Sequence, residues 1–522
     1  MKKILDSVHG QIQIPKKWFD KIIDTPNFQR LRRIEQNSCR TVFPSARHDR
    51  FIHSIGVYHI GNMIAKHIDE ENRKEPFIPN YGYDILKTYK LACLLHDVGH
   101  TPFSHTFENY FNRNEIYEEL KNELKDNTFE NDYKRRKEEP ATHELLSACV
   151  AIKLFKNELN DKDINWALLV RMIIGIPFTN NNDQQRDNSK FENIMIDLLH
   201  GSIDADRLDY VCRDVWAGGY RNYSINLQRL IDAIYIKKNN QNYQLSFSPK
   251  ALNEIENVLN IKNFQHIYVI NHHKVSLEQH YLVEAMKTTA IYHLNNNKER
   301  DEALKDLCNF KSFLEEITLP KTRYKLHKPC DDDFIALMKQ TPCDDYIKGW
   351  LGRKFQHKPL WKSKILFFDY FSNIPFKATP SKIQGKNTTE IVEKIIKYRI
   401  DSICGSKCKK HVIERLGLKD EDIIQVRIKS KISKIDPEKI LISFDKGNST
   451  KTLSELIHNS FAVTGDSYDF CYWYVNLDKI NINNDNDNDN DNDNEKRNND
   501  NEKRNKVINE IKNFINTITF EL

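Results

Sequence analysis

Histidine and aspartate side chains at four places in the first 206 residues are of the types that hold a metal ion. His53 lies in the apolar run RFIHSIGVYHIG, His96 and Asp97 follow LACLL, and Asp206 lies in DADRLDY. Consecutive residues on a helix point about 100° apart, so His96 and Asp97 reach one ion only in a crevice beside a helix end. Two imidazoles and two carboxylates suit Mn, Fe, Zn, Co or Ni better than Mg alone.

The chemistry that such a centre would support is hydrolysis of a phosphate ester. Four protein ligands leave positions open for water or a phosphoryl oxygen, and the metal lowers the pKa of that water or polarises the phosphorus centre. The alternative is that each residue is an ordinary core or capping residue. A helix N-terminus accounts for only one or two of Asp204, Asp206 and Asp209. In LLHDVGH an unpartnered charge after an apolar run would be costly, which favours the metal centre.

Six segments give this chemistry a family context. DSVHGQIQIP, IIDTPNFQRLRRIEQ, VFPSARHDRFIHSIGV, LLHDVGHTPFSHTFE, THE and IDADRLDYVCRD follow one another in this order. The sequence resembles the HD-domain metal-dependent phosphohydrolases and, within them, the deoxynucleoside triphosphate triphosphohydrolases. The resemblance is strong over about residues 1–220, weaker to about 300 and faint beyond. It implies cleavage of a dNTP to a deoxynucleoside and inorganic triphosphate, with Mg²⁺ on the substrate phosphates.

The resemblance also implies roles for individual residues. His53, His96, Asp97 and Asp206 would be the metal ligands. His105 would be the general acid/base, paired with Glu108 where the family has Asp, since an imidazole oriented by a carboxylate suits proton delivery to a leaving 5′-oxygen. The implied channel and sugar contacts are Arg50, His100, His143, Arg207, Tyr210, Asp214 and Gln36. Arg50 could instead be a surface residue, Tyr210 a core residue and His143 a helix cap.

Four more residues match family positions that bind an activating guanine nucleotide at a subunit interface, namely Lys2, Asp24, Gln29 and Arg32. This match implies a homo-oligomer, with a tetramer as the expected form, activated by GTP or dGTP. The alternative is a capped helix with solvated arginines. Later in the chain the family has an Arg that binds the substrate, shortly before a His-Lys pair. Here the pair is His273-Lys274, and Asn263 lies near the position of that Arg. That departure leaves the base preference and the triphosphate preference open.

Helices joined by short loops are expected to position these residues. Helical spacing predicts helices within 25–36, 51–68 and 83–98, the last ending at Gly99 as a C-cap. Residues 115–140 are polar and predict a solvated helical excursion; further helices are expected at 142–155, 191–216, 251–296 and 388–416. The runs KILFFDYF, DIIQVRIKSKI, EKILISFD and FCYWYVNL predict strands.

The expected fold is mainly α, with an HD-domain helical core and a smaller α+β C-terminal lobe. We assign residues 1–300 to the core, 301–480 to the lobe, 481–505 to a disordered Asn/Asp-rich linker and 506–522 to a short amphipathic helix. Calcium binding by the Asn/Asp tract is the alternative to a solvated linker.

The composition of the chain indicates the compartment and the kinds of partner that we expect. The chain has 522 residues, a net charge of +5 and ten scattered cysteines, which indicates a reducing compartment rather than a disulfide framework. Cys404 and Cys408 are the only close pair, and a zinc site would need two more ligands. No signal-peptide pattern and no apolar run of about 20 residues is present. We therefore expect a soluble cytoplasmic protein, with the nucleus left open and no membrane or nucleic-acid partner indicated.

Three functions remain in competition at this point. The first is a dNTP triphosphohydrolase. The second is another HD hydrolase, acting on nucleoside monophosphates, cyclic nucleotides or single-stranded nucleic acid. The third is a non-catalytic nucleotide sensor, which the complete set of metal and acid/base residues disfavours.

Overall fold

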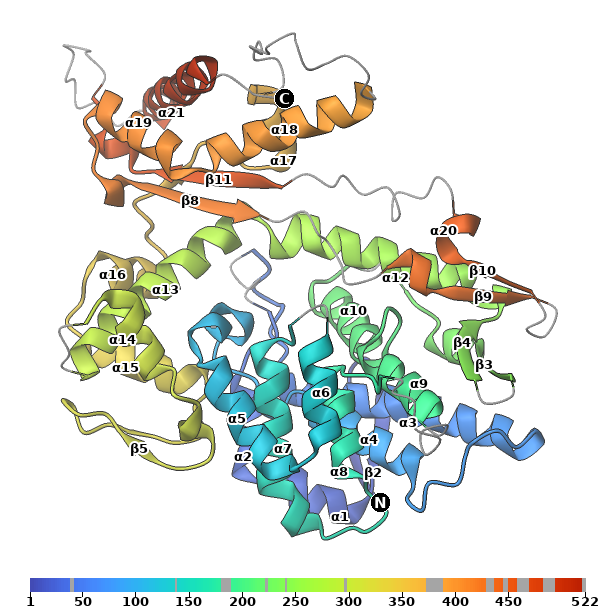
Figure 1. Ribbon diagram of the computed structural model, residues 1–522. Helices are drawn as coiled ribbons and strands as arrows, with labels where there is room; N and C mark the ends of the chain where they lie inside the picture. The colour runs from blue at the N-terminus through green and yellow to red at the C-terminus, as the bar shows by residue number, and fades with distance from the viewer. Residues whose placement is uncertain are drawn as a thin grey trace. The chain divides into compact units, whose positions relative to one another are not determined.

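The computed structural model describes residues 1–37, 42–136, 139–179, 189–220, 224–239, 242–294, 298–371, 388–428, 436–444, 449–457, 469–481 and 493–518. The chain forms two compact units (Figure 1). The first comprises Met1–Gln265, Val283–Asp344 and Ser433–Thr464, and the second His266–Leu282, Asp345–Ile432 and Gly465–Leu522. Helices dominate, so the prediction of a mainly α fold is confirmed.

The first unit begins with an antiparallel β-hairpin, which the sequence patterns did not predict. Strand β1 (Lys2–Asp6) pairs with β2 (Gly10–Ile14), and Ile12 and Ile14 turn inward. The short elements α1 (Lys16–Trp18), η1 (Phe19–Ile23), α2 (Pro26–Gln29) and η2 (Arg30–Arg33) follow. Thr25 caps α2 by accepting from the Phe28 amide, and Pro26 occupies the first turn, where its missing N–H costs nothing.

The long helix α3 (Arg50–Lys74) is the central support of this unit. Asp49 caps it by accepting a hydrogen bond from the Ile52 amide, at 2.9 Å. Its buried residues point to several neighbours because α3 packs against both α4 (Ile85–Leu95) and α10 (Ala205–Ala217). Gly61 lets α4 approach, since a Cβ there would lie 2.5 Å from Cys93 Sγ.

Helices α5, α7, α8 and α9 complete a bundle with α3 and α4 (Figure 1). Helix α4 also packs against α8, α8 packs against α7 and α9, and α7 packs against α5. The predicted excursion at 115–140 folds into α5 and α6, which bury Ile116, Leu120 and Phe129. The bounds are α5 (Arg113–Leu124), α6 (Asn127–Arg135), α7 (Thr142–Leu159), α8 (Trp166–Ile174), α9 (Ser189–His200), α11 (Leu227–Ile231), α12 (Leu252–Gln265), α14 (Arg300–Leu307) and α15 (Asp331–Gln340).

A four-stranded sheet of order β10-β9-β4-β3 belongs to the same unit. Strands β3 (Ile234–Asn239) and β4 (Asn242–Phe247) form a hairpin, and β4 pairs in parallel with β9 (Leu441–Phe444), which pairs with β10 (Ser449–Thr452). Because β9 pairs with β4, residues near 440 group with the first unit. The compact units therefore differ from the division at residue 300 that composition suggested.

The second unit is built on a three-stranded antiparallel sheet of order β7-β11-β8. Strand β11 (Phe470–Val475) is buried along its whole length between β7 (Lys358–Pro359) and β8 (Ile423–Ile428), and Trp361 and Trp473 fill the core. Helices α16 (Asp345–Gly352), α17 (Lys364–Phe371), α18 (Thr388–Ile403), α19 (Ser406–Leu416) and α21 (Asp493–Thr517) accompany it, and α13 (His273–Leu294) contributes residues to both units.

Two expectations for this unit were wrong. The run KILFFDYF is helix α17 rather than a strand, because Phe367 and Phe371 share one buried face at a spacing of four while Ile365 is 76% exposed. The helix α21 starts at Asp493, so residues 493–505 are helical rather than disordered. Glu, Lys and Arg favour that helix, and Asp500 pairs with Lys358 at 2.8 Å. The predictions for 482–492 lie outside the described residues.

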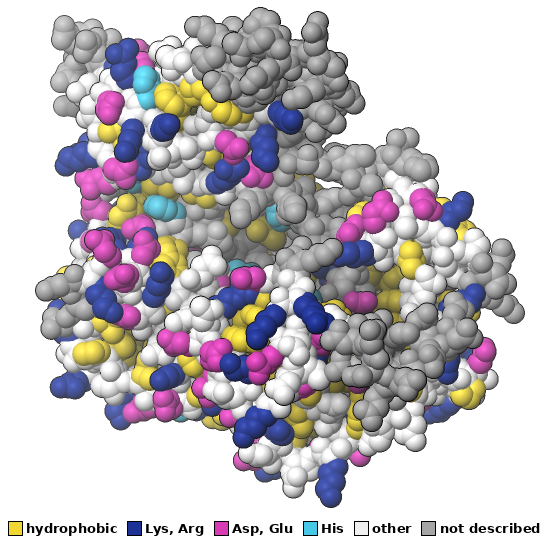
Figure 2. All heavy atoms as spheres, viewed as in Figure 1, with side chains coloured by type: hydrophobic (Ala, Val, Ile, Leu, Met, Phe, Trp, Pro, Cys, Tyr) yellow, Lys and Arg dark blue, Asp and Glu magenta, His cyan; other side chains and the backbone are white. Residues whose placement is uncertain are grey.

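No helix in the described part of the chain combines the length and apolarity needed to cross a bilayer. On the face seen in Figure 2, basic and acidic side chains are interspersed, in keeping with the small net charge.

Candidate metal centre and acid/base cluster

The predicted metal ligands meet where α3, the end of α4 and the start of α10 come together. His53 Nε2 lies 3.3 Å from His96 Nε2, 3.0 Å from Asp206 Oδ1 and 3.7 Å from Asp97 Oδ2. His96 Nε2 lies 3.6 Å from both carboxylates. His53 and Asp97 are buried, whereas the Asp206 side chain is 39% exposed, so the centre is closed by protein on one side and reachable at Asp206.

The donor atoms fit a metal ion on two counts. His53 Nδ1 donates to Asp209 and His96 Nδ1 donates to the Cys93 carbonyl, so in the neutral imidazoles both Nε2 lone pairs face each other. Two lone pairs at 3.3 Å repel unless a cation lies between them. Ligand atoms bonded at about 2.1 Å to one ion stand about 3.0–3.4 Å apart, which is the range of the closest contacts here.

The ionisation of His53 points to the same conclusion. Burial lowers the pKa of His53, but hydrogen bonds to Asp206 and Asp209 outweigh burial and raise the pKa to about 10. Burial alone would raise the pKa of Asp206, yet the two imidazoles hold it well below its usual range. Without a metal, a proton on His53 supplies the positive charge that these carboxylates require. A divalent ion would take the place of that proton.

A close helix approach fixes the turn that carries His96 and Asp97. Helix α4 ends at Leu95, four residues before the predicted C-cap at Gly99, because the Val98 and His100 amides form turn hydrogen bonds to Leu95 and Asp97. Gly99 does not have the left-handed conformation of a C-cap. A Cβ at Gly99 would instead lie 2.5 Å from the backbone of α7. The Gly99 amide donates to Ser147 Oγ on that helix. Glycine is therefore needed here for contact with α7.

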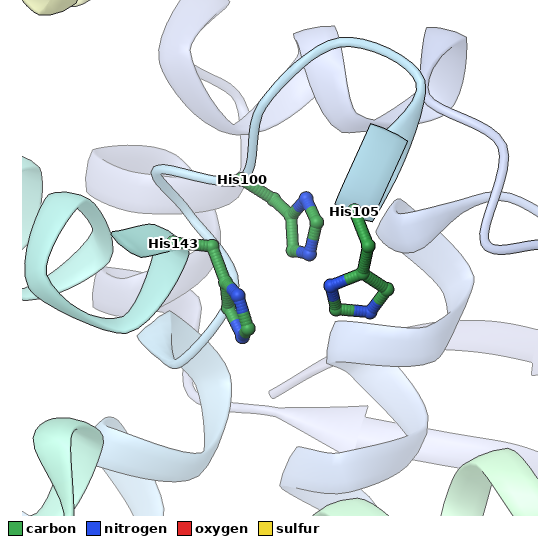
Figure 3. Close-up of side chains that lie close together, drawn as sticks. All are labelled: His100, His105 and His143. Carbon is green, nitrogen blue, oxygen red and sulfur yellow. The ribbon is translucent and has the colours of Figure 1, made fainter. Parts of the chain in front are cut away.

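Three histidines form a second group beside the first (Figure 3). His100 comes from the loop after α4, His105 from η4 (Ser104–Thr106) and His143 from the first turn of α7, and the three rings gather closely. The ring centroids of His100 and His143 are 4.5 Å apart in a stacked arrangement. His105 is the accessible member, with 63% of its side chain exposed.

Glu108 holds two of these histidines. Its Oε2 accepts from His105 Nδ1 at 3.1 Å, while its Oε1 accepts from the Nδ1 and the backbone amide of His143. Burial lowers the pKa of His143, but Glu108 outweighs burial and raises it to about 9. The pKa of His100 falls well below normal, through burial and then the Arg50 charge. Glu108 thus serves a pair of imidazoles rather than His105 alone.

Arg50 joins the two groups. It donates to Asp97 Oδ2 in the first group and to Ser104 Oγ at 2.8 Å, and its Nη2 lies 3.5 Å from His105 Nε2. Both Arg50 and Asp97 are buried. The predicted alternative for Arg50, a surface residue in a polar loop, is therefore wrong.

The loop that carries His105 is strained and braced. Phe103 and Ser104 have φ values of 54° and 52°, a left-handed conformation that non-glycine residues seldom adopt. Asp331, at the start of α15, accepts hydrogen bonds from the amides of Phe103, at 2.6 Å, and Glu35, at 3.0 Å. Ser104 Oγ donates to the Glu35 carbonyl. These contacts hold His105 on its loop, and sequence patterns did not identify Asp331.

The other four predicted substrate contacts have different surroundings. Arg207 is buried and donates to the carbonyls of Gly201 and Ser202 and to Asp204. Asp214 pairs with His48 at 2.7 Å, and Tyr210 packs on Val211, Val215 and Ile261. Gln36 Oε1 is buried with no hydrogen-bond partner among the described residues. A ligand would satisfy that oxygen, and the substrate roles of all four residues stay predictions.

The residues matched to an activator site lie on the N-terminal elements. Gln29 accepts from Arg32 Nε at 2.8 Å and donates to the Ile23 carbonyl, and the Arg32 guanidinium stacks over Phe51. Lys2 lies over the ring of Phe19, and Asp24 follows η1. Their role in binding a nucleotide stays a prediction.

Asp209 is a site residue whose role the sequence patterns did not assign. It accepts from His53 Nδ1 at 2.7 Å and from Arg213 at 2.8 and 2.9 Å. The available signal was its position three residues after Asp206, which places both carboxylates near one face of α10. Gly56, one turn after His53, leaves room for the Asp209 side chain. A Cβ at position 56 would lie 1.9 Å from Asp209 Oδ1 and 2.4 Å from Arg213.

We expect Gly56→Ala to destabilise the protein by about 3 kcal/mol, because overpacking a buried site outweighs the helix preference of alanine. The new methyl group would push Asp209 away from His53, so metal retention should fall as well. Denaturant unfolding and metal analysis of the purified variant measure the two effects.

The control for this variant is Gly352→Ala. Gly352 ends α16, and a Cβ there meets nothing within 4 Å. This control should unfold like the unmodified chain. Equal stability and equal metal content in the two variants would contradict the packing account of Gly56.

Comparisons with known proteins agree with this geometry. A family model described as the HD domain matches residues 50–175, which include His53, His96 and Asp97. The chain is 29% identical over 289 residues to a protein of Acanthamoeba polyphaga mimivirus named for its HD domain, covering 52% of this chain and 54% of that protein. It is 42% identical over 112 residues to human deoxynucleoside triphosphate triphosphohydrolase SAMHD1, covering 21% of this chain and 17% of that enzyme.

Among solved structures, a phosphohydrolase from Bacteroides thetaiotaomicron superposes with a TM-score of 0.54 at 19% identity, covering 91% of this chain and 99% of that one. At that identity the likeness concerns the fold. The chain spans about half the length of the curated relatives that it matches over the longest stretches.

Proposed function

Since the chain carries an HD domain, we propose that it is a metal-dependent phosphohydrolase that cleaves deoxynucleoside triphosphates to a deoxynucleoside and inorganic triphosphate. The observation that carries this proposal is the link through Arg50 between two groups, the His53–His96–Asp97–Asp206 centre and the His105–Glu108–His143 cluster. One group suits a metal that activates water, and the other suits proton transfer to a leaving oxygen. The 42% identity to SAMHD1 supports the choice of dNTP.

In this proposal His53, His96, Asp97 and Asp206 would hold a divalent metal, which would supply Lewis acidity toward a water molecule and the α-phosphoryl group. The water oxygen bonds to the α-phosphorus and releases a proton to solvent, and the bond from phosphorus to the 5′-oxygen breaks. His105 delivers a proton to that oxygen while Glu108 holds its Nδ1–H. Arg50 and His143 supply positive charge beside the phosphates, and the exposed side of His105 faces the incoming substrate.

The assay that tests this proposal incubates the purified protein with each of the four dNTPs and Mn²⁺ or Mg²⁺, and separates the products by ion exchange. A deoxynucleoside and triphosphate in equal amounts support the proposal. Pyrophosphate, or turnover only of nucleoside monophosphates, cyclic nucleotides or single-stranded nucleic acid, supports another HD hydrolase instead. Nucleotide binding without turnover would make the protein a sensor and contradict the proposal.

Activation by a guanine nucleotide is a second part of the proposal. Lys2, Asp24, Gln29 and Arg32 lie on the N-terminal elements, where a base and its phosphates would find an amide, a carboxylate and two cations. We expect GTP or dGTP to convert the protein to a tetramer and to raise its dNTPase activity. Size-exclusion chromatography with and without each nucleotide, followed by assay of the fractions, measures both changes. A fully active monomer that neither nucleotide alters would contradict this part.

A further inference from the structure

A buried group of charged side chains connects the N-terminal hairpin to the metal ligand His53. Its centre is Asp209, whose Oδ2 accepts from His53 Nδ1 at 2.7 Å and whose Oδ1 accepts from His9 Nε2 at 2.6 Å. Arg213 donates to both oxygens of Asp209 and, with its two terminal nitrogens, to both oxygens of Asp6 at 2.8 and 2.9 Å. The group runs from the hairpin to the metal centre without a gap.

Burial makes these contacts obligatory. The side chains of His9, Asp209, Arg213 and Asp6 are each at most 4% exposed. Asp209 has about four lone-pair sites, and four N–H donors occupy them. Loss of one donor would leave part of a buried charge without a partner, which is costly. Asp209 therefore has little freedom to rotate while all four donors are present.

The hairpin sets the position of His9. His9 lies in the turn between β1, which ends at Asp6, and β2, which begins at Gly10, and these two residues are cross-strand partners. Gly10 has φ of +71°, which glycine adopts readily, and the Val8 amide donates to Asp6. The His9 ring also packs 5.4 Å from the ring of His59 on α3.

We propose that His9 is a positioning residue for the metal ligand His53 and acts through Asp209, so that the hairpin at residues 2–14 is part of the support of the metal centre. A carboxylate on Nδ1 fixes the imidazole tautomer that presents its Nε2 lone pair to a metal, and it increases the basicity of that nitrogen. His9 holds the carboxylate in the orientation that His53 needs. This inference rests on the proposed metal-dependent function.

The test uses Co²⁺ as the probe, because its visible absorption reports the ligand field and does not require turnover. Metal-free protein is titrated with Co²⁺ for the unmodified chain, His9→Phe, His9→Ala and His9→Gln. His9→Phe keeps a ring against His59 and removes the donor, and we expect it and His9→Ala to bind Co²⁺ about 10–100-fold more weakly, with a shifted absorption band. His9→Gln restores an N–H donor, so it should recover most of the affinity.

Tyr58→Phe is the matched control. Tyr58 donates to the Gln13 carbonyl on the same hairpin, at 3.2 Å, and does not contact Asp209 in the described hydrogen bonds. We expect its Co²⁺ affinity and spectrum to match those of the unmodified chain. The proposal is overturned if His9→Phe binds Co²⁺ like the unmodified chain, or if Tyr58→Phe weakens binding equally. If the unmodified chain itself binds no Co²⁺, the result contradicts the metal centre on which the proposed function depends.

Discussion

Asp97→Asn is expected to reduce kcat/KM for the proposed dNTP hydrolysis by at least about a thousandfold, or roughly 4 kcal/mol of transition-state stabilisation. The substitution keeps the shape of the side chain but removes a negative charge that faces both His53 and His96 and accepts from Arg50. The metal should be lost or held weakly, and Arg50 should lose its ion-pair partner. Steady-state kinetics and metal analysis of the same preparation measure the two losses.

The control must account for the cost of an unpaired buried arginine, which can destabilise by several kcal/mol. Asp132→Asn provides it, because Asp132 pairs with Arg171 at 2.9 Å with both side chains buried. Among the described residues its other hydrogen-bond partner is Thr179. We expect Asp132→Asn to lose stability to a similar extent while retaining its metal and its turnover. Full activity in Asp97→Asn would exclude the assignment of Asp97 as a ligand.

The second large effect is expected at the acid/base cluster. His105→Gln and Glu108→Gln should each lower kcat by about 10²–10⁴-fold, the usual contribution of a positioned proton donor. Their metal content should stay at the level of the unmodified chain, which separates this defect from that of Asp97→Asn. Because His105 and Glu108 share one hydrogen bond, the double variant should lose little more than either single variant. Additive losses would show that the two residues act independently.

The same cluster predicts a pH dependence of stability. Glu108 raises the pKa of His143 from 6.5 to about 9 in the folded chain, so the folded state binds this proton more tightly than the unfolded state does. The stabilisation is complete below pH 6.5 and disappears as the pH rises through about 9. Melting temperatures recorded between pH 6 and 10 should therefore fall in that window for the unmodified chain and fall less for Glu108→Gln, in which the remaining decline comes from His53 with its pKa of about 10. Parallel curves for the two proteins would contradict this account of the pair.

Side-chain chemistry and local periodicity singled out the four metal-ligand candidates in advance, and the family resemblance supplied the roles of His105 and Glu108. His53 and the His96-Asp97 pair stood out because apolar runs surround them, and polar residues in such runs need partners. Asp206 stood out through its neighbouring carboxylates. The structure brings all four together, and it places His105 and Glu108 in direct contact. The mainly α fold followed from the helical repeat in 51–68, which α3 reproduces.

What could not be predicted depends on contacts between distant segments. The hairpin at residues 2–14 is short, and Ile12 and Ile14 are buried only because the rest of the unit packs against them. The local sequence does not show that packing. The run KILFFDYF is apolar enough for a strand or a helix, and burial of Phe367 with Phe371 decides for the helix. His9 lies 200 residues from Asp209 in the chain, and neither spacing nor composition relates them.

The loop at Phe103 and Ser104 trades stability of the fold for a fixed position of His105. Two consecutive left-handed residues without a glycine cost about 1–2 kcal/mol each. The hydrogen bonds that the Phe103 amide donates to Asp331 and that Arg50 donates to Ser104 offset that cost. Glycine at positions 103 and 104 would adopt the left-handed conformation without this cost and would make the folded chain more stable. It would also give the loop more conformational freedom. Phe103 and Ser104 restrict the loop to one conformation. His105 is therefore already oriented for the proposed proton transfer before a substrate binds.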